Sequence, residues 1–191
     1  MTTAMPASPP SPADDFALMA AIAQGDSVAF KTFYDRHSPA VYALAVRMLR
    51  SPQDAEQLLT DVFFEIWSAR DRYDMDRANP LTYLMRLTRS RAIDRLRRKG
   101  PVGTRATSLD PAEGIDVPVD ATPAADAEVD EERRRVAAAL GAIDQDHRKI
   151  IECAYFDGLS HSEIAQRLNK PLGTVKSSIR LGLAKLKDLL Q

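Results

Sequence analysis

Hydrophobic residues recur every three or four positions through most of the chain, which is the spacing of one face of an α-helix. The stretch that follows Ser51 and Pro52 shows this clearly, with a shared apolar face made of Ala55, Leu59, Val62 and Ile66. Ser is a good helix N-cap and Pro fits the first helical position, so both mark a helix start. Helix formers dominate, and long runs of Val, Ile and Thr are missing. The pattern predicts an all-α protein.

The helical pattern is interrupted in two places. Residues 1–13 are rich in Pro, Ser and Ala, which is typical of a disordered tail. Residues 100–127 combine Pro and Gly with many acids, which is typical of a flexible linker. We therefore expect two small helical domains, residues 14–99 and 128–191, joined by a flexible acidic linker.

Residues 158–187 contain the most specific local signal. Gly158 can end a helix in the left-handed conformation, and Ser160 with Glu163 forms a capping box at the next helix start. Pro171 prevents that helix from continuing. A second helix follows, with inward-facing Val175, Ile179, Leu183, Leu186 and Leu190. A short helix, a tight turn and a longer helix indicate a helix-turn-helix.

The outer face of that second helix is basic near its N-terminus. Lys176, Ser177 and Arg180 project away from the apolar stripe, where a recognition helix meets base edges and phosphates. An ordinary helical hairpin with a solvated basic face is the simpler alternative, but the cap, turn and stripe lengths favour the helix-turn-helix. We interpret His161 as an exposed first-turn residue and Cys153 as a small core residue.

A second basic surface is predicted on the helix that begins after Asn79. Between residues 86 and 99 the only acid is Asp94. The same stretch has seven basic residues: Arg86, Arg89, Arg91, Arg95, Arg97, Arg98 and Lys99. Solvated helix faces normally mix charges, so this one suits a phosphate backbone better than a purely solubilising role. The preceding polar loop holds Tyr73 and Arg77, and with Asn79 it offers a place for an unstacked base.

The formal net charge of −1 conceals strong segmentation. Residues 27–100 carry 14 basic and nine acidic residues, and residues 133–191 carry 11 basic and six acidic ones. Residues 101–132, between them, hold one Arg against nine acids. No signal peptide or membrane span is visible in the sequence. We expect a cytoplasmic protein without direct membrane insertion.

Two blocks of this chain resemble the extracytoplasmic-function (group IV) sigma factors. The first block contains FKTFYDRHSPAVYALAVRML, SPQDAEQLLTDVFFEIW and LTYLMRLTRSRAIDRLRR. The second is DQDHRKIIECAYFDGLSHSEIAQRLNKPLGTVKSSIRLGLAKLKDLL. Together they span roughly residues 27–99 and 130–190. The resemblance implies sigma region 2, a linker and sigma region 4, with no region 3.

The resemblance also implies partners and site residues. Core RNA polymerase would be bound through its largest-subunit clamp helices by Asp54, Gln57, Asp61, Phe64 and Glu65. The −10 element would be bound by Tyr73, Arg77, Asn79, Tyr83, Arg86, Arg89, Ser90 and Arg97. The −35 element would be bound by Thr174, Lys176, Ser177, Ser178 and Arg180, with the polymerase flap tip also touching this domain. An anti-sigma factor, often membrane-anchored in this family, would regulate the protein.

The sequence departs from the family pattern at several of these positions. Tyr83 stands where Trp is usual, and Ser90 stands where Asn is usual. Thr60 replaces a common Gln in the polymerase-binding helix. Ser178 and Leu181 occupy positions that are often Arg, so we expect altered −35 affinity or specificity.

Two other function classes fit the sequence less well. A stand-alone helix-turn-helix regulator would bind duplex operators, and it would leave the basic helix before residue 99 unexplained. An enzyme is disfavoured because the sequence has no phosphate loop, nucleophile elbow or metal-ligand spacing. We accordingly expect no cofactor and no metal site.

Overall fold

The computed structural model describes residues 12–74, 78–99, 134–135, 138–139 and 141–190, and in these ranges every regular element is a helix. The predicted all-α fold is therefore confirmed for the part of the chain that the structure describes. Pro12 and Ala13, which we expected in the disordered tail, lie in the first helix. The rest of the tail, the predicted linker at 100–127 and Arg77 lie outside the described residues.

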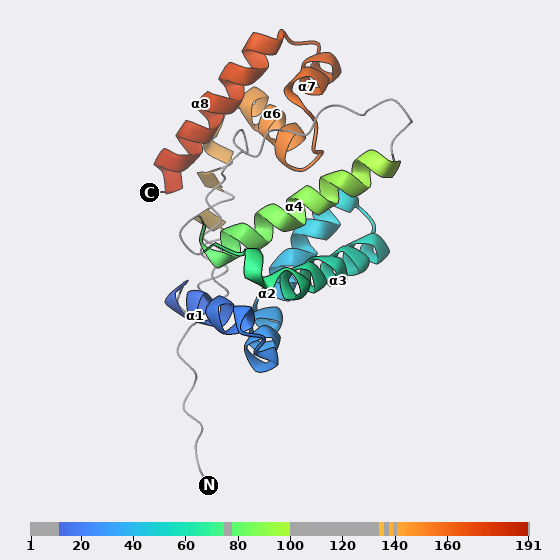
Figure 1. Ribbon diagram of the computed structural model, residues 1–191. Helices are drawn as coiled ribbons and strands as arrows, with labels where there is room; N and C mark the ends of the chain where they lie inside the picture. The colour runs from blue at the N-terminus through green and yellow to red at the C-terminus, as the bar shows by residue number, and fades with distance from the viewer. Residues whose placement is uncertain (1–11, 75–77, 100–133, 136–137, 140, 191) are drawn as a thin grey trace.

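The N-terminal bundle consists of α1 (Pro12–Ala23), α2 (Ser27–Leu49), α3 (Pro52–Ser68), the 3₁₀-helix η1 (Arg70–Arg72) and α4 (Pro80–Lys99). Figure 1 shows α4 lying along α3, with α2 behind both. Their apolar faces meet in one core, in which Phe33, Leu58 and Leu84 are fully buried. Burial of such side chains, at about 1.5–3 kcal/mol each, is the main force that holds the four helices together.

The helix starts of this bundle are set by local hydrogen bonds. The Ser51 hydroxyl accepts from the Asp54 amide at 3.3 Å, as the sequence predicts. The Asn79 side chain accepts from the Leu81 amide at 2.9 Å and starts α4 in the same way. These caps satisfy amides that have no partner within the helix.

The C-terminal bundle consists of α6 (Gln145–Tyr155), α7 (His161–Leu168) and α8 (Leu172–Leu190). The predicted capping box is present, because the Ser160 amide donates to the Glu163 carboxylate at 2.7 Å and the Ser160 hydroxyl accepts from the Glu163 amide. Asn169 ends α7 in the left-handed conformation. We expected the turn to run from Asn169 to Gly173, but α8 already begins at Leu172. The arrangement is a helix-turn-helix preceded by a supporting helix.

Two glycines lie at close approaches between helices. Gly158 has a φ of +65°, and a Cβ there would lie 2.8 Å from Ile93 Cγ1 on α4. A Cβ at Gly182 on α8 would lie 2.6 Å from Ile151 Cδ1 on α6. The first glycine brings the C-terminal bundle against the N-terminal one, and the second brings α8 against α6.

Candidate nucleic-acid interface

The basic residues of α4 do not form one continuous face, because they point in three directions. Arg86 and Ser90 are exposed to solvent, and Arg98 is exposed nearer the side of the helix that carries Arg91. Arg89 faces the C-terminal bundle, whereas Arg91 and Arg95 face α3. Arg86 and Ser90 lie on one side of α4, which we call the α4 ridge. Consecutive helical residues are about 100° apart, so Arg89 and Arg91 lie on opposite sides of this ridge.

Arg89 is occupied by the end of α6. Its Nη2 donates to the Ala154 carbonyl at 2.8 Å, and its Nε donates to the Tyr155 carbonyl at 3.1 Å. These carbonyls belong to the last turn of α6, where a helix leaves acceptors without partners and where a cation is favoured. Burial lowers the pKa of Arg89 from its usual value. The residue that we selected for DNA contact is thus half-buried between the two bundles.

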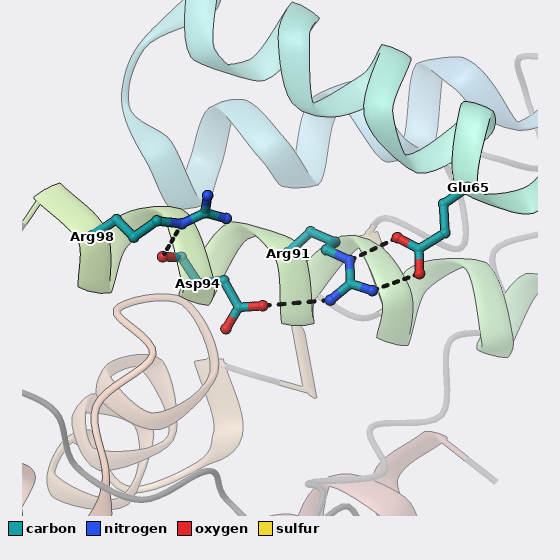
Figure 2. Close-up of polar contacts among 4 residues, drawn as sticks. All are labelled: Glu65, Arg91, Asp94 and Arg98. Carbon is teal, nitrogen blue, oxygen red and sulfur yellow. Dashed lines mark hydrogen bonds and ion pairs between the residues drawn. The ribbon is translucent and has the colours of Figure 1, made fainter.

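Arg91 and Arg95 hold α4 against the acidic side of α3. Arg91 binds Glu65 with both ends of its guanidinium, at 2.7 Å from Nε to Oε2 and at 2.5 Å from Nη2 to Oε1 (Figure 2). These hydrogen bonds lower the pKa of Glu65. Arg95 pairs with Asp61 at 2.5 Å and also donates to the Asp54 carbonyl at 2.9 Å.

The two ion pairs were missed in the sequence analysis, which treated the α3 acids and the α4 bases as separate surfaces. The sequence does contain a signal for these pairs. The two acids on α3 are four positions apart in the chain, and so are the two arginines on α4. Such spacings place side chains on one helix face. What could not be read from the sequence is that the two faces lie next to each other.

Tyr73 makes two contacts with residues at the start of α4 or just before it. The Tyr73 hydroxyl donates to the Ala78 carbonyl at 2.6 Å, and its ring lies 5.2 Å from the Tyr83 ring. Burial raises the pKa of Tyr73 to about 12. Tyr73 and Tyr83, two of the selected −10 residues, therefore form a tilted aromatic pair beside Asn79 at the start of α4.

The outer face of α3 carries the remaining candidates for polymerase contact. Phe64 is 68% exposed, an unusual exposure for a large aromatic side chain. Gln57 and Asp61 are also exposed on this face, while Asp54 and Glu65 are half-buried. Phe63, next to Phe64, is buried in the core.

In the helix-turn-helix, four of the five selected −35 residues are exposed, namely Thr174, Lys176, Ser177 and Arg180. Ser178 is only 6% exposed, so the expectation that it faces DNA is corrected. It follows Val175 by three residues and precedes Gly182 by four, which places it on the buried stripe of α8. Leu181, in contrast, is exposed.

Two family models match this chain, one for each bundle. The model described as "Sigma-70 region 2" matches residues 33–101, and the model described as "Sigma-70, region 4" matches residues 139–188. The chain is 37% identical over 174 residues to the ECF RNA polymerase sigma factor SigK of Mycolicibacterium vanbaalenii, covering 91% of this chain and 88% of the relative. It is 36% identical over 183 residues to SigK of Mycobacterium ulcerans, covering 95% of this chain and 97% of the relative.

The chain belongs to the extracytoplasmic-function sigma factors.

Two solved structures of other proteins are also similar to this chain. SigE of Rhodobacter sphaeroides, in complex with the anti-sigma ChrR, is 30% identical with a TM-score of 0.48, covering 92% of this chain and 99% of that one. CnrH, in complex with the cytosolic domain of CnrY, is 26% identical with a TM-score of 0.44, covering 93% and 97%.

As a sigma factor, the protein acts in transcription initiation together with RNA polymerase and promoter DNA. Within the described residues of this sigma factor, no group of His, Cys, Asp or Glu side chains is placed to hold a metal ion. None of its described helices is long and apolar enough to cross a membrane.

Proposed function

We propose that this sigma factor divides its three tasks among three helix faces. The outer face of α3 binds the clamp helices of core RNA polymerase through Asp54, Gln57, Asp61, Phe64 and Glu65. The ridge of α4 and the loop before it bind the −10 element. The N-terminal half of α8 binds the −35 element.

The observation that carries this proposal is the exposed basic ridge in each bundle. Arg86 and Ser90 are exposed on α4, while Lys176 and Arg180 are exposed near the start of α8. Cationic side chains on an accessible helix face neutralise phosphates, and polar side chains between them can read base edges. The Tyr73–Tyr83 pair adds an aromatic surface on which an unstacked base can lie, at about 1–3 kcal/mol per base.

We further propose residues 14–99 and 128–191 as the two functional domains, joined by the acidic linker. The protein acts without catalysing a reaction of its own and works where RNA polymerase works, in the cytoplasm. The flap tip of the polymerase contacts the C-terminal domain. These proposals rest on the family membership and on the two exposed ridges.

We also propose regulation by an anti-sigma factor that binds around both bundles and masks their DNA-facing ridges. Family membership supports this proposal, since an inhibitor that blocks promoter contact must cover α4, α8 or both. Truncated chains in which neither bundle alone contacts the inhibitor would contradict it.

Run-off transcription with purified core polymerase on a promoter library tests the function as a whole. The full chain should direct initiation from templates that share two short elements, and core alone should not. Lys176→Ala should weaken use of the upstream element, whereas Lys185→Ala, the same change later on α8, should have little effect. A chain that does not associate with core polymerase would overturn the proposal.

The α3 face has its own matched pair of variants. Phe64→Ala should weaken association with core polymerase, because a large exposed aromatic is a favoured contact residue in protein interfaces. Val28→Ala removes another strongly exposed apolar side chain, on α2 rather than α3. Equal loss of core affinity in both variants would contradict the assignment of α3.

A further inference from the structure

Glu65 and Asp61 lie at a junction between two surfaces. Both belong to the α3 face that we propose for polymerase binding, and both are also bound to arginines of α4. Arg91 lies beside Ser90 on the adjoining flank of the α4 ridge, and Arg95 lies one turn further along the same flank. Glu65 and Asp61 therefore lie between the proposed polymerase-binding face of α3 and two arginines next to the α4 ridge.

The two carboxylates are accessible enough to exchange partners. The Asp61 side chain is 62% exposed and that of Glu65 is 34% exposed, whereas the Arg91 side chain is 40% exposed and that of Arg95 is 15% exposed. Exposed ion pairs contribute little net stability, because water and other charges compete for the same groups. A cationic partner surface that approaches α3 would compete directly with Arg91 and Arg95 for the two carboxylates.

While the pairs hold, the arginines are poor ligands for phosphate. Each arginine is neutralised by a carboxylate, and that carboxylate would itself repel an approaching phosphate. Asp94 also reduces the attraction of Arg91 for phosphate, since its Oδ2 lies 3.5 Å from Nη1 of Arg91 (Figure 2). Releasing Arg91 and Arg95 would extend the basic ridge toward α3 by two cations.

We propose that Arg91 and Arg95 are additional DNA-binding residues that become available when Glu65 and Asp61 exchange them for cations of the polymerase. This inference rests on the proposed function, namely that α3 binds polymerase and α4 binds promoter DNA. Docking of α3 then strengthens DNA binding by α4 through a local exchange of ion pairs. A purely structural role, in which the pairs only fasten α4 to α3, is the competing outcome.

The test uses the full free chain without polymerase, binding a labelled mixed-sequence single-stranded DNA of about 20 nucleotides. Glu65→Gln removes the acid that holds Arg91 and keeps the shape of the side chain. Affinity should rise about fivefold at ~0.1 M salt, and the salt dependence should steepen by about 0.7 in log–log slope, the value for one added phosphate contact on single strands.

The matched control is Asp35→Asn. Asp35 pairs with Lys31 on the surface of α2, so this variant has the same change in net charge and frees a cation away from α4. Its affinity and salt slope should stay near those of the unaltered chain. If Glu65→Gln and Asp35→Asn behave alike, the proposal is overturned.

Two further variants guard against a misleading result. Glu65→Gln combined with Arg91→Gln should lose the gain in affinity, because the freed cation is no longer there. If Glu65→Gln fails to fold, Asp61→Asn should reproduce part of the gain through Arg95, which also has to leave the Asp54 carbonyl. The transcription assay with the unaltered chain and polymerase reports separately on the proposed function, so the two failures can be told apart.

Discussion

Arg89 of α4 and Tyr155 of α6 are joined across the two bundles, with the Arg89 Nε donating to the Tyr155 carbonyl at 3.1 Å. The same guanidinium lies 5.1 Å from the centre of the Tyr155 ring. Nearby, Arg47 lies 3.5 Å from the centre of the Phe156 ring. Because two of its donors are engaged by α6 and its side chain is half-buried between the bundles, we expect Arg89 to contact a phosphate only after the bundles move apart.

Gly158 offers a direct way to loosen this contact. In Gly158→Ala the new methyl would meet Ile93, so we expect the two bundles to separate and the radius of gyration from small-angle scattering to rise. The left-handed backbone adds a cost of about 1–2 kcal/mol for any residue with a Cβ. Gly25→Ala carries the same backbone cost at a φ of +85° but meets no atom within 4 Å. An equal radius of gyration in both variants would show that the glycine contact does not hold the bundles together.

Ser178 and Ser177 differ in burial although they are neighbours on α8. Ser178→Lys should destabilise the C-terminal bundle by about 2 kcal/mol or more, because it forces a charge toward the buried stripe. Ser177→Lys should leave stability nearly unchanged and steepen the salt dependence of DNA binding by about 0.9 in slope. Thermal unfolding and salt-titrated binding measure the two effects. Similar melting temperatures for both variants would contradict the burial of Ser178.

Asp15 ties α1 to α2 through Arg36 at 2.5 Å and His37 at 3.0 Å. Burial raises the pKa of Asp15, but the hydrogen bonds and charges of His37 and Arg36 outweigh it, so the net pKa lies below the ordinary value of 3.8. A carboxylate whose pKa is lower in the folded than in the unfolded protein stabilises the folded state. This stabilisation is fully present at pH values above the unfolded-state pKa, and it is lost as the pH falls through the folded-state pKa.

Asp15→Asn should therefore lower the free energy of unfolding by about 2 kcal/mol near neutral pH, and by clearly less near pH 3. Urea unfolding at both pH values measures the difference. Asp14→Asn, an exposed neighbour, serves as the control. A loss that is the same at both pH values would rule out the ionised carboxylate as its source.

The capping box at Ser160 should contribute measurably to the helix-turn-helix. Ser160→Ala removes the acceptor for the Glu163 amide and should cost about 1 kcal/mol of stability. Ser162→Ala makes the same chemical change at an exposed position, where the hydroxyl contacts that of Ser160. If chemical denaturation gives the same free energy of unfolding for the two variants, the cap contributes no measurable stability.

The helix starts and the helix-turn-helix could be predicted because their causes are local. The Ser51 cap and the Ser160–Glu163 box each join groups three residues apart, so the chain order already places the partners together. The burial of Ser178 can also be predicted from the sequence, since the helical period places it on the same buried stripe as Val175 and Gly182. We assigned it to DNA on the family resemblance, and the period was the better guide.

The helical character of most segments, several of the helix starts and the presence of basic helices in both bundles follow from the amino-acid order, because these properties depend on residues within a few positions of one another. Which of the basic residues are available to a ligand depends on how the helices pack. Arg89 meets a carbonyl 66 positions away, and Arg91 meets a carboxylate 26 positions away. Such partners are set by how the apolar faces of the helices pack against one another, and burial of those faces, rather than the charges, determines that packing.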